Sequence, residues 1–117
     1  MSNNSILDGL LYGIGKLPGS YKHDKLPTKI DISNVAKAQV GFDRLLVILK
    51  DGSVMGCGAS DYHALADVDD APTLTPIPTK NYDNERILFV SNLYSASVAM
   101  SDSNLFMFGQ TYVYLLY

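Results

Sequence analysis

The side chains that most often perform catalysis or hold metals are few in this chain and stand far apart. The 117 residues include two histidines, His23 and His63, and one cysteine, Cys57. A structural zinc site needs four nitrogen or sulfur ligands at close spacing, which these residues do not offer. Cys57 lies in an apolar run, and a small buried residue is its expected role rather than a nucleophile. We therefore expect no metal site and no thiol chemistry.

Two further clusters resemble ion-binding motifs but lack their spacing. Asp67, Asp69 and Asp70 form an acidic run without the glycine that an EF-hand loop requires at its sixth position. Gly13-Ile14-Gly15-Lys16 lacks the remaining glycine spacing and the Lys-Ser or Lys-Thr pair of a phosphate-binding loop. No serine stands in a recognisable nucleophile elbow. The sequence predicts a protein that is not an enzyme and that uses no cofactor.

The best candidates for binding are aromatic and polar residues expected in loops and at the C-terminal end. Tyr62 and His63 follow a glycine-ended apolar run, and loops of this kind commonly carry residues that contact a partner. Residues 112–117 are uncharged, β-prone and rich in tyrosine, including Tyr114 and Tyr117. Such a segment is an aggregation hazard unless something covers it. We interpret these four residues as candidate partner contacts; the alternatives are a Tyr62 folded over its own sheet and an ordinary core strand at 112–117.

Composition narrows the classes of partner and compartment. The net charge is −3, and the nine basic residues are scattered, which argues against nucleic acid and against a polybasic membrane contact. No apolar run reaches the roughly 20 residues of a membrane span, and the first residues lack the basic region of a signal peptide. A single cysteine cannot form an internal disulfide. We expect an intracellular protein, cytoplasmic or nuclear, that contacts other proteins.

An internal repeat supplies the elements that must position any binding residues. Residues 8–15, 51–58 and 102–109 each begin with a turn pair, continue through apolar residues and end on glycine. The repeats begin at Asp8, Asp51 and Asp102, and such spacings suit a propeller blade or a helical array. Asp-Gly between apolar runs predicts a two-residue type I′ hairpin, with positive φ at both turn residues. The repeat is therefore built from strands.

Each repeat is expected to hold four strands. Residues 44–50 and 95–101 read as strands that lead into the turn pairs. An offset of 51 residues aligns Gly41 with Asn92 in an earlier turn, where Asn would replace Gly at positive φ. The proline-containing segments 26–30 and 74–79 read as edge strands, because proline cannot donate a ladder hydrogen bond. Residues 60–67 could add one helical turn.

These features predict an all-β fold, a partial β-propeller of about two to three four-stranded blades that is incomplete as a ring. One repeat domain would cover residues 1–117, with units at about 1–33, 34–84 and 85–117. The repeat resembles that of the regulator-of-chromosome-condensation family, in its glycine turn, apolar strand, Asp-Gly and glycine-ended strand. The matching positions are Val40-Gly41, residues 45–49, Asp51-Gly52, residues 54–58 and Leu65.

The repeat also departs from that family's pattern. Arg44 and Ser95 stand where the family usually has His, and Ile14, Cys57 and Phe108 replace the Trp before the closing glycine. The usual Asn and Gly of the following loop are replaced by Ser60, His63 and Ala66. The family's propellers usually have seven blades, so the units here are degenerate and few.

Two or three blades leave unpaired sheet edges. Three explanations for such open edges remain. The chain is a fragment, it associates with copies of itself, or it docks on a larger protein that covers the edges. The expected function is a non-catalytic protein–protein interaction or structural module, a subunit or fragment of a larger assembly. The alternative, implied by the resemblance, is guanine-nucleotide exchange on a small GTPase, for which the sequence shows no inserted hairpin.

Overall fold

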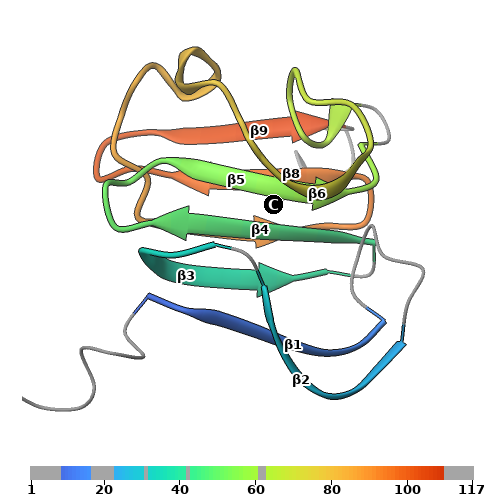
Figure 1. Cartoon of the computed structure of the whole chain (residues 1–117). Coiled ribbons are helices and arrows are strands. Elements are labelled where there is room, and N and C mark those ends of the chain that lie inside the picture. The colour runs from blue at the N-terminus through green and yellow to red at the C-terminus, as the bar shows by residue number, and fades with distance from the viewer. Residues whose placement is uncertain (1–8, 17–22, 31, 42, 61–62, 110–117) are drawn as a thin grey trace, which may run out of the picture.

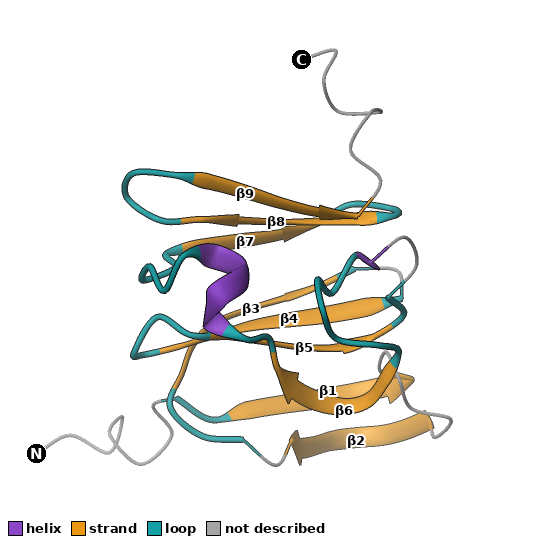
Figure 2. Cartoon of the chain, turned by 90° about the horizontal axis from the view of Figure 1, so that it is seen from above, coloured by secondary structure: helices purple, strands orange, loops and turns teal. Residues whose placement is uncertain are grey.

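Three antiparallel β-sheets are stacked in layers in the computed structural model, which describes residues 9–16, 23–30, 32–41, 43–60 and 63–109 (Figures 1 and 2). The first sheet holds β1 (Leu11–Lys16) and β2 (His23–Ile30). The second has the order β3 (Val35–Val40), β4 (Arg44–Leu49), β5 (Val54–Gly58) and β6 (Ala71–Pro76). The third has the order β7 (Phe89–Asn92), β8 (Ala96–Met100) and β9 (Leu105–Gly109).

The all-β prediction is confirmed, and each sheet falls inside one of the three expected units. The strands expected at 44–50 and 95–101 are β4 and β8. The edge strand expected at 74–79 overlaps β6, which runs from Ala71 to Pro76 and is the outer edge of the second sheet. The expected helical turn within 60–67 is present, since the N–H of Ala66 donates to the carbonyl oxygen of His63 at 2.9 Å.

The hydrophobic core lies on both faces of the second sheet. Leu46 and Ile48 belong to the cluster that meets the third sheet, whereas Leu45 and Val47 belong to the cluster that meets the first. All four are almost fully buried. A central strand covered on both faces needs a continuous apolar run, which is what residues 45–49 supply.

The turn between β4 and β5 differs from the predicted type I′ hairpin. Gly52 has φ +88°, but Asp51 is not among the residues with positive φ. The N–H of Leu49 donates to the carbonyl oxygen of Ser53 at 2.9 Å, which closes a three-residue loop with glycine in the left-handed position. The turn between β8 and β9 is one residue shorter, because Met100 pairs with Leu105 where Ile48 pairs with Val54.

This shorter turn shifts the alignment of the earlier strands by one residue. The N–H of Gly41 donates to the Arg44 carbonyl at 2.7 Å, and the N–H of Leu93 donates to the Ala96 carbonyl at 2.8 Å. Gly41 is therefore equivalent to Leu93, at an offset of 52. The prediction that Gly41 and Asn92 occupy equivalent positions in the two repeats is wrong. Neither residue has positive φ.

The closing glycines keep the offset of 51 and show why glycine recurs there. Gly58 has φ +102° and Gly109 has φ +110°. A Cβ at Gly58 would lie 2.1 Å from the carbonyl oxygen of Asp43, and one at Gly109 would lie 2.4 Å from that of Ser95. Both positions require glycine for its backbone conformation and for the close approach of the neighbouring strand.

A short 3-10 helix, η2 (Thr79–Tyr82), connects the second sheet to the third and was not expected from the sequence. Its Tyr82 is buried in the core. The Tyr82 hydroxyl accepts a hydrogen bond from the N–H of Val54 at 3.1 Å and donates to the Ile77 carbonyl at 3.3 Å. The connection is thereby fixed to the first residue of β5.

Candidate interaction surface

Three of the residues considered for chemistry are buried, hydrogen-bonded or ion-paired in the structure: Cys57, Asp67 and Asp70. Cys57 is buried, and burial raises the pKa of its thiol, which disfavours the reactive thiolate. Asp70 accepts the N–H of Ser60 at 2.6 Å, and Asp67 forms an exposed ion pair with Lys80 at 3.4 Å. Within the described part of the chain, no three His, Cys, Asp or Glu side chains cluster as a metal ion requires.

Of the four predicted partner contacts, the structure describes His63. It is exposed, with φ +62°, and its N–H donates to the Ser60 carbonyl at 3.0 Å. The next residues of this loop, Ala64 and Leu65, are fully buried and anchor it to the core. Tyr62, Tyr114 and Tyr117 lie outside the described residues, so all four remain predictions.

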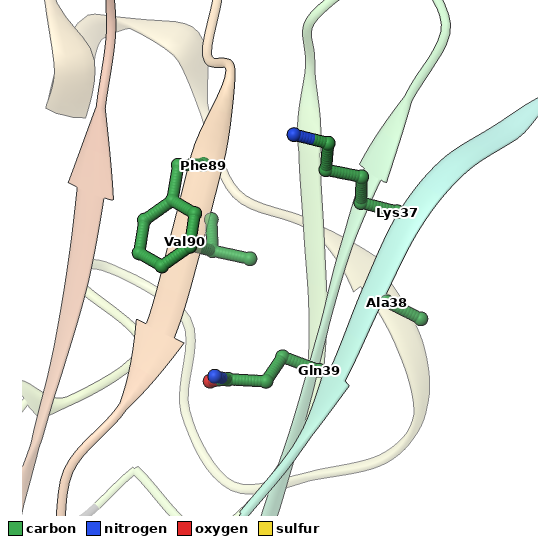
Figure 3. A pocket seen from close by; sticks show the side chains of 5 residues that line it. All are labelled: Lys37, Ala38, Gln39, Phe89 and Val90. Atoms are coloured by element: carbon green, nitrogen blue, oxygen red, sulfur yellow. The ribbon is translucent and has the colours of Figure 1, made fainter.

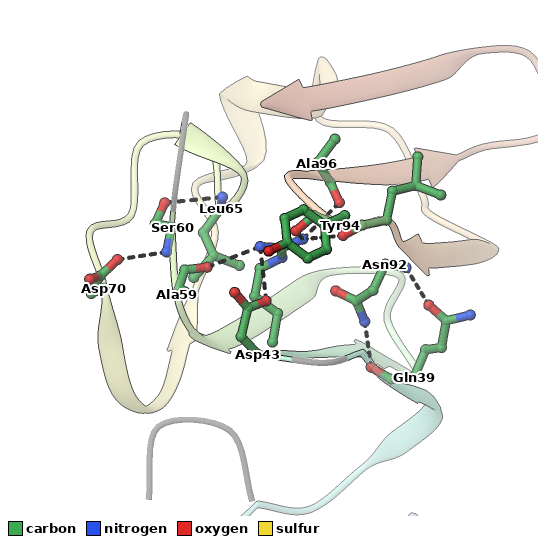
Figure 4. Close-up of polar contacts among 11 residues, drawn as sticks. Gln39, Asp43, Ala59, Ser60, Leu65, Asp70, Asn92, Tyr94 and Ala96 are labelled. Atoms are coloured by element: carbon green, nitrogen blue, oxygen red, sulfur yellow. Dashed lines mark hydrogen bonds and ion pairs between the residues drawn. The ribbon is translucent and has the colours of Figure 1, made fainter. Parts of the chain in front are cut away.

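Arg44 joins the second sheet to the turn between β7 and β8, and its side chain is 1% exposed. Figure 4 shows Asp43 and Ala59 lying close to Tyr94 and Ala96. Nη2 donates to the carbonyl oxygens of Leu93, Tyr94 and Ala96, the last two at 3.2 and 3.0 Å. Nη1 lies 3.3 Å from the Asp43 carboxylate. The residue that departs from the family pattern is therefore a link between sheets.

The edge strands β3 and β7 of the second and third sheets meet through polar side chains and enclose a shallow hollow. Gln39 accepts the N–H of Asn92 through its side chain, and its carbonyl accepts Asn92 Nδ2 at 2.9 Å. Lys37 Nζ donates to the Leu88 carbonyl at 3.0 Å. The hollow is about 310 Å³, and Figure 3 shows Lys37 and Gln39 reaching toward β7 while Ala38 points away. Lys37 is the ionisable group among the residues that line the hollow.

An uncharged apolar face lies on the third sheet, on the side away from the second. Register places Phe89, Met100 and Leu105 in one row across the three strands. Their exposed fractions are 47%, 42% and 60%. The adjacent row on the same face is Ser91, Val98 and Met107, each partly buried. We call these six residues the third-sheet face.

The opposite side of the same sheet is covered. Val90, Ala99, Phe106 and Phe108 belong to, or pack against, the cluster shared with the second sheet. Contiguous exposed apolar patches of this kind mark interaction sites in folded proteins. The third-sheet face is therefore an exposed apolar surface on a sheet whose other side is covered.

Sequence reasoning did not single out this face, although the signal was present. Alternation within residues 89–91, 98–100 and 105–107 places one set of side chains on each side of the sheet. What the sequence alone could not supply was which side the rest of the chain covers. That depends on the stacking order of the sheets, visible in Figure 2.

Comparison with known proteins identifies the fold but no family. No family model matches the chain, and no curated protein sequence matches it. Among solved structures, the crystal structure of human WBSCR16 matches with a TM-score of 0.73 and 21% sequence identity. The match covers 87% of this chain and 29% of the human chain, so this chain spans less than a third of that protein. No helix in the described residues is long and apolar enough to cross a membrane.

Proposed function

We propose that this chain is a non-catalytic protein-interaction module built from propeller blades, of the regulator-of-chromosome-condensation type. In this proposal β3 to β6 form one blade, β7 to β9 belong to the next, and β1 and β2 to the preceding one. The structural match to human WBSCR16 supports the all-β fold on which this proposal rests. The module acts as part of a larger assembly, and its partner is a protein.

The observation that carries the proposal is the third-sheet face. Its most exposed members, Phe89, Met100 and Leu105, are large and apolar and stand in one row. At about 25 cal/mol per Å² of apolar surface removed from water, covering such a row favours association by several kcal/mol before the entropic cost of binding. No charged residue stands in the two rows, so no unpaired charge opposes desolvation.

Site-specific photo-crosslinking in cells tests this proposal. A benzophenone amino acid replaces Leu105 in one variant and Tyr94 in a matched control, because Tyr94 is 81% exposed but lies in the β7–β8 turn, outside the face. We expect a discrete protein adduct from position 105 and none from position 94. Equal labelling at both positions, or no adduct at either, would count against the proposal.

Guanine-nucleotide exchange on a small GTPase is the second candidate, because it is the activity that the family resemblance implies. Fold similarity alone does not select between the two functions. Nucleotide release from a panel of small GTPases, followed with and without the chain, separates them. We expect no acceleration; a clear acceleration by the chain would replace the non-catalytic proposal.

A further inference from the structure

The outer edge of the second sheet is β6, and one side of its backbone has no strand paired to it among the described residues. Unpaired N–H and C=O groups along such an edge form a template on which a strand of another chain can add. Pro72, Thr73 and Pro76 are exposed on this strand. The direction of each N–H group of β6 therefore decides whether the edge can accept a further strand.

The pairing with β5 fixes which residues of β6 face inward. The N–H of Ile77 donates to the Val54 carbonyl at 3.0 Å, and the same register continues back to Thr75. Alternate residues of an antiparallel strand direct their N–H and C=O groups to the same side, so Thr75 also faces β5. Pro76, which stands between these two residues, and Leu74 therefore face away from the sheet.

A second proline occupies the outward position at the start of β6. Ala71 pairs with Gly58, so the alternation directs the next residue, Pro72, away from β5. Proline has no N–H group. Among the three outward-facing residues, Pro72, Leu74 and Pro76, Leu74 alone can therefore donate a hydrogen bond to an added strand.

The inner edge of the third sheet is protected in a different way, by side chains of the second sheet. The N–H of Asn92 donates to the side chain of Gln39, and the Leu88 carbonyl accepts Lys37 Nζ at 3.0 Å. These caps come from an adjoining sheet. At β6 the protection is built into the strand itself, because a proline leaves no N–H that needs a cap.

We infer that Pro72 and Pro76 keep β6 from pairing edge to edge with β6 of a second copy of this chain. Such pairing is symmetric, since it sets the same edge of two copies against each other, and it needs the outward N–H groups that the prolines lack. The inference concerns a different surface from the third-sheet face and does not depend on what that face binds.

Restoring the missing donors tests this inference. Pro72→Thr and Pro76→Thr together give β6 three outward N–H groups, and threonine is well accepted in strands. Light scattering on a sizing column, over a wide range of concentration, should give the double variant a larger mass than wild type at the same concentration. The protomer has a mass of 12.8 kDa. Each restored N–H adds two hydrogen bonds to a symmetric pair of edges, so the concentration of half-association should fall by about tenfold for each proline replaced.

The matched control is Pro78→Thr, because Pro78 is also exposed but precedes η2 and lies outside β6. It should keep the wild-type mass, and circular dichroism should show the same strand content for all three proteins. If the double variant does not fold, Pro76→Thr alone decides, since the N–H of Ile77 fixes the outward direction of position 76. A folded β6 variant with the wild-type mass at every concentration, or equal association of the Pro78 variant, overturns the inference.

Photo-crosslinking locates the new contact. A benzophenone amino acid at position 73 of the double variant should link to residues 71–76 of another copy. Adducts to other segments alone would mean that the association does not use this edge, and would refute the inference. The crosslink from position 105 tests the proposed function separately, because β6 and β9 belong to different sheets.

Discussion

Replacing Arg44 by Met should destabilise the fold far more than replacing a typical surface arginine. The Arg44 side chain is 1% exposed, and its Nη2 is shared by three backbone carbonyl oxygens in the β7–β8 turn. Swapping a buried ion pair for apolar residues is often neutral when both partners are replaced. Here the acceptors are backbone groups that no side-chain substitution removes, so Met leaves the carbonyl oxygens of Leu93 and Tyr94 without this donor, whereas that of Ala96 keeps the N–H of Leu93.

The magnitude follows from the hydrogen bonds that the guanidinium makes. A hydrogen bond from a charged donor contributes about 1.5–3 kcal/mol, and one nitrogen shared by three oxygens is worth no more than about two such bonds. We therefore expect the free energy of unfolding to fall by about 3 kcal/mol, a large part of the 5–15 kcal/mol that holds a typical domain together. With a urea m-value of about 1.5 kcal/mol/M, the unfolding midpoint should fall by about 2 M.

Urea unfolding followed by circular dichroism measures this shift, with Arg86→Met as the control. Arg86 is exposed, and its Nη2 makes one hydrogen bond, to the Lys50 carbonyl at 2.7 Å. Its loss should cost about 0.5 kcal/mol, as for most surface substitutions. Arg44→Lys should lie between the two, because lysine retains the charge without the planar fork. An Arg44→Met midpoint as high as that of Arg86→Met would refute the view that this residue links the sheets.

Three further substitutions test other parts of the structure. Gly58→Ala places a Cβ 2.1 Å from a backbone oxygen at φ +102°, so it should lower the thermal midpoint by at least several degrees, whereas Gly56→Ala, which meets flexible leucine and isoleucine side chains, should lower it less. Tyr82→Phe leaves the N–H that opens β5 without its acceptor and should cost about 1 kcal/mol in urea unfolding. Hydrogen bonds from the side chain and backbone of Ser53 hold the pKa of Asp51 below its usual 3.8. The stability that these bonds contribute is fully present above that value and is lost as the pH falls through the lower pKa of the folded state. The difference in stability between wild type and Asp51→Ala should therefore shrink in acid and stay constant near neutral pH.

The strands could be predicted from local chemistry, but their alignment could not. Asp51-Gly52 marks a turn with glycine at positive φ, the closing glycines mark close approaches of neighbouring strands, and the apolar run of β4 needs cover on both faces. The predicted alignment of Gly41 with Asn92 between the repeats was wrong because the β8–β9 turn is one residue shorter than the β4–β5 turn. When a turn loses one residue, every strand position before that turn shifts by one in the alignment of the two repeats. The side-chain pattern of short strands with small residues does not reveal this shift.

The candidate surface was less accessible to sequence reasoning than the strands for a different reason. The sequence places Arg44 at the start of a strand but does not show that the opposing turn offers its guanidinium three carbonyl oxygens. Leu105 and Met100 read as ordinary strand residues, because an apolar residue on a strand is equally expected whether a neighbouring sheet covers it or not. The alternation of side chains in the sequence shows which positions share a face of the sheet. Only the order in which the sheets are stacked shows which face another sheet covers.

The stack of sheets has a polarity that the repeat positions make visible. Leu11, Val54 and Leu105 occupy the same repeat position, and the first two are each covered by the sheet that follows in the chain. The contact within the chain therefore joins unlike faces, because the face of the second sheet that carries Val54 is covered by the face of the third sheet that carries Val90 and Ala99. Close packing of this kind requires complementary side chains, so Val90 and Ala99 are small where Leu46 and Ile48 are large.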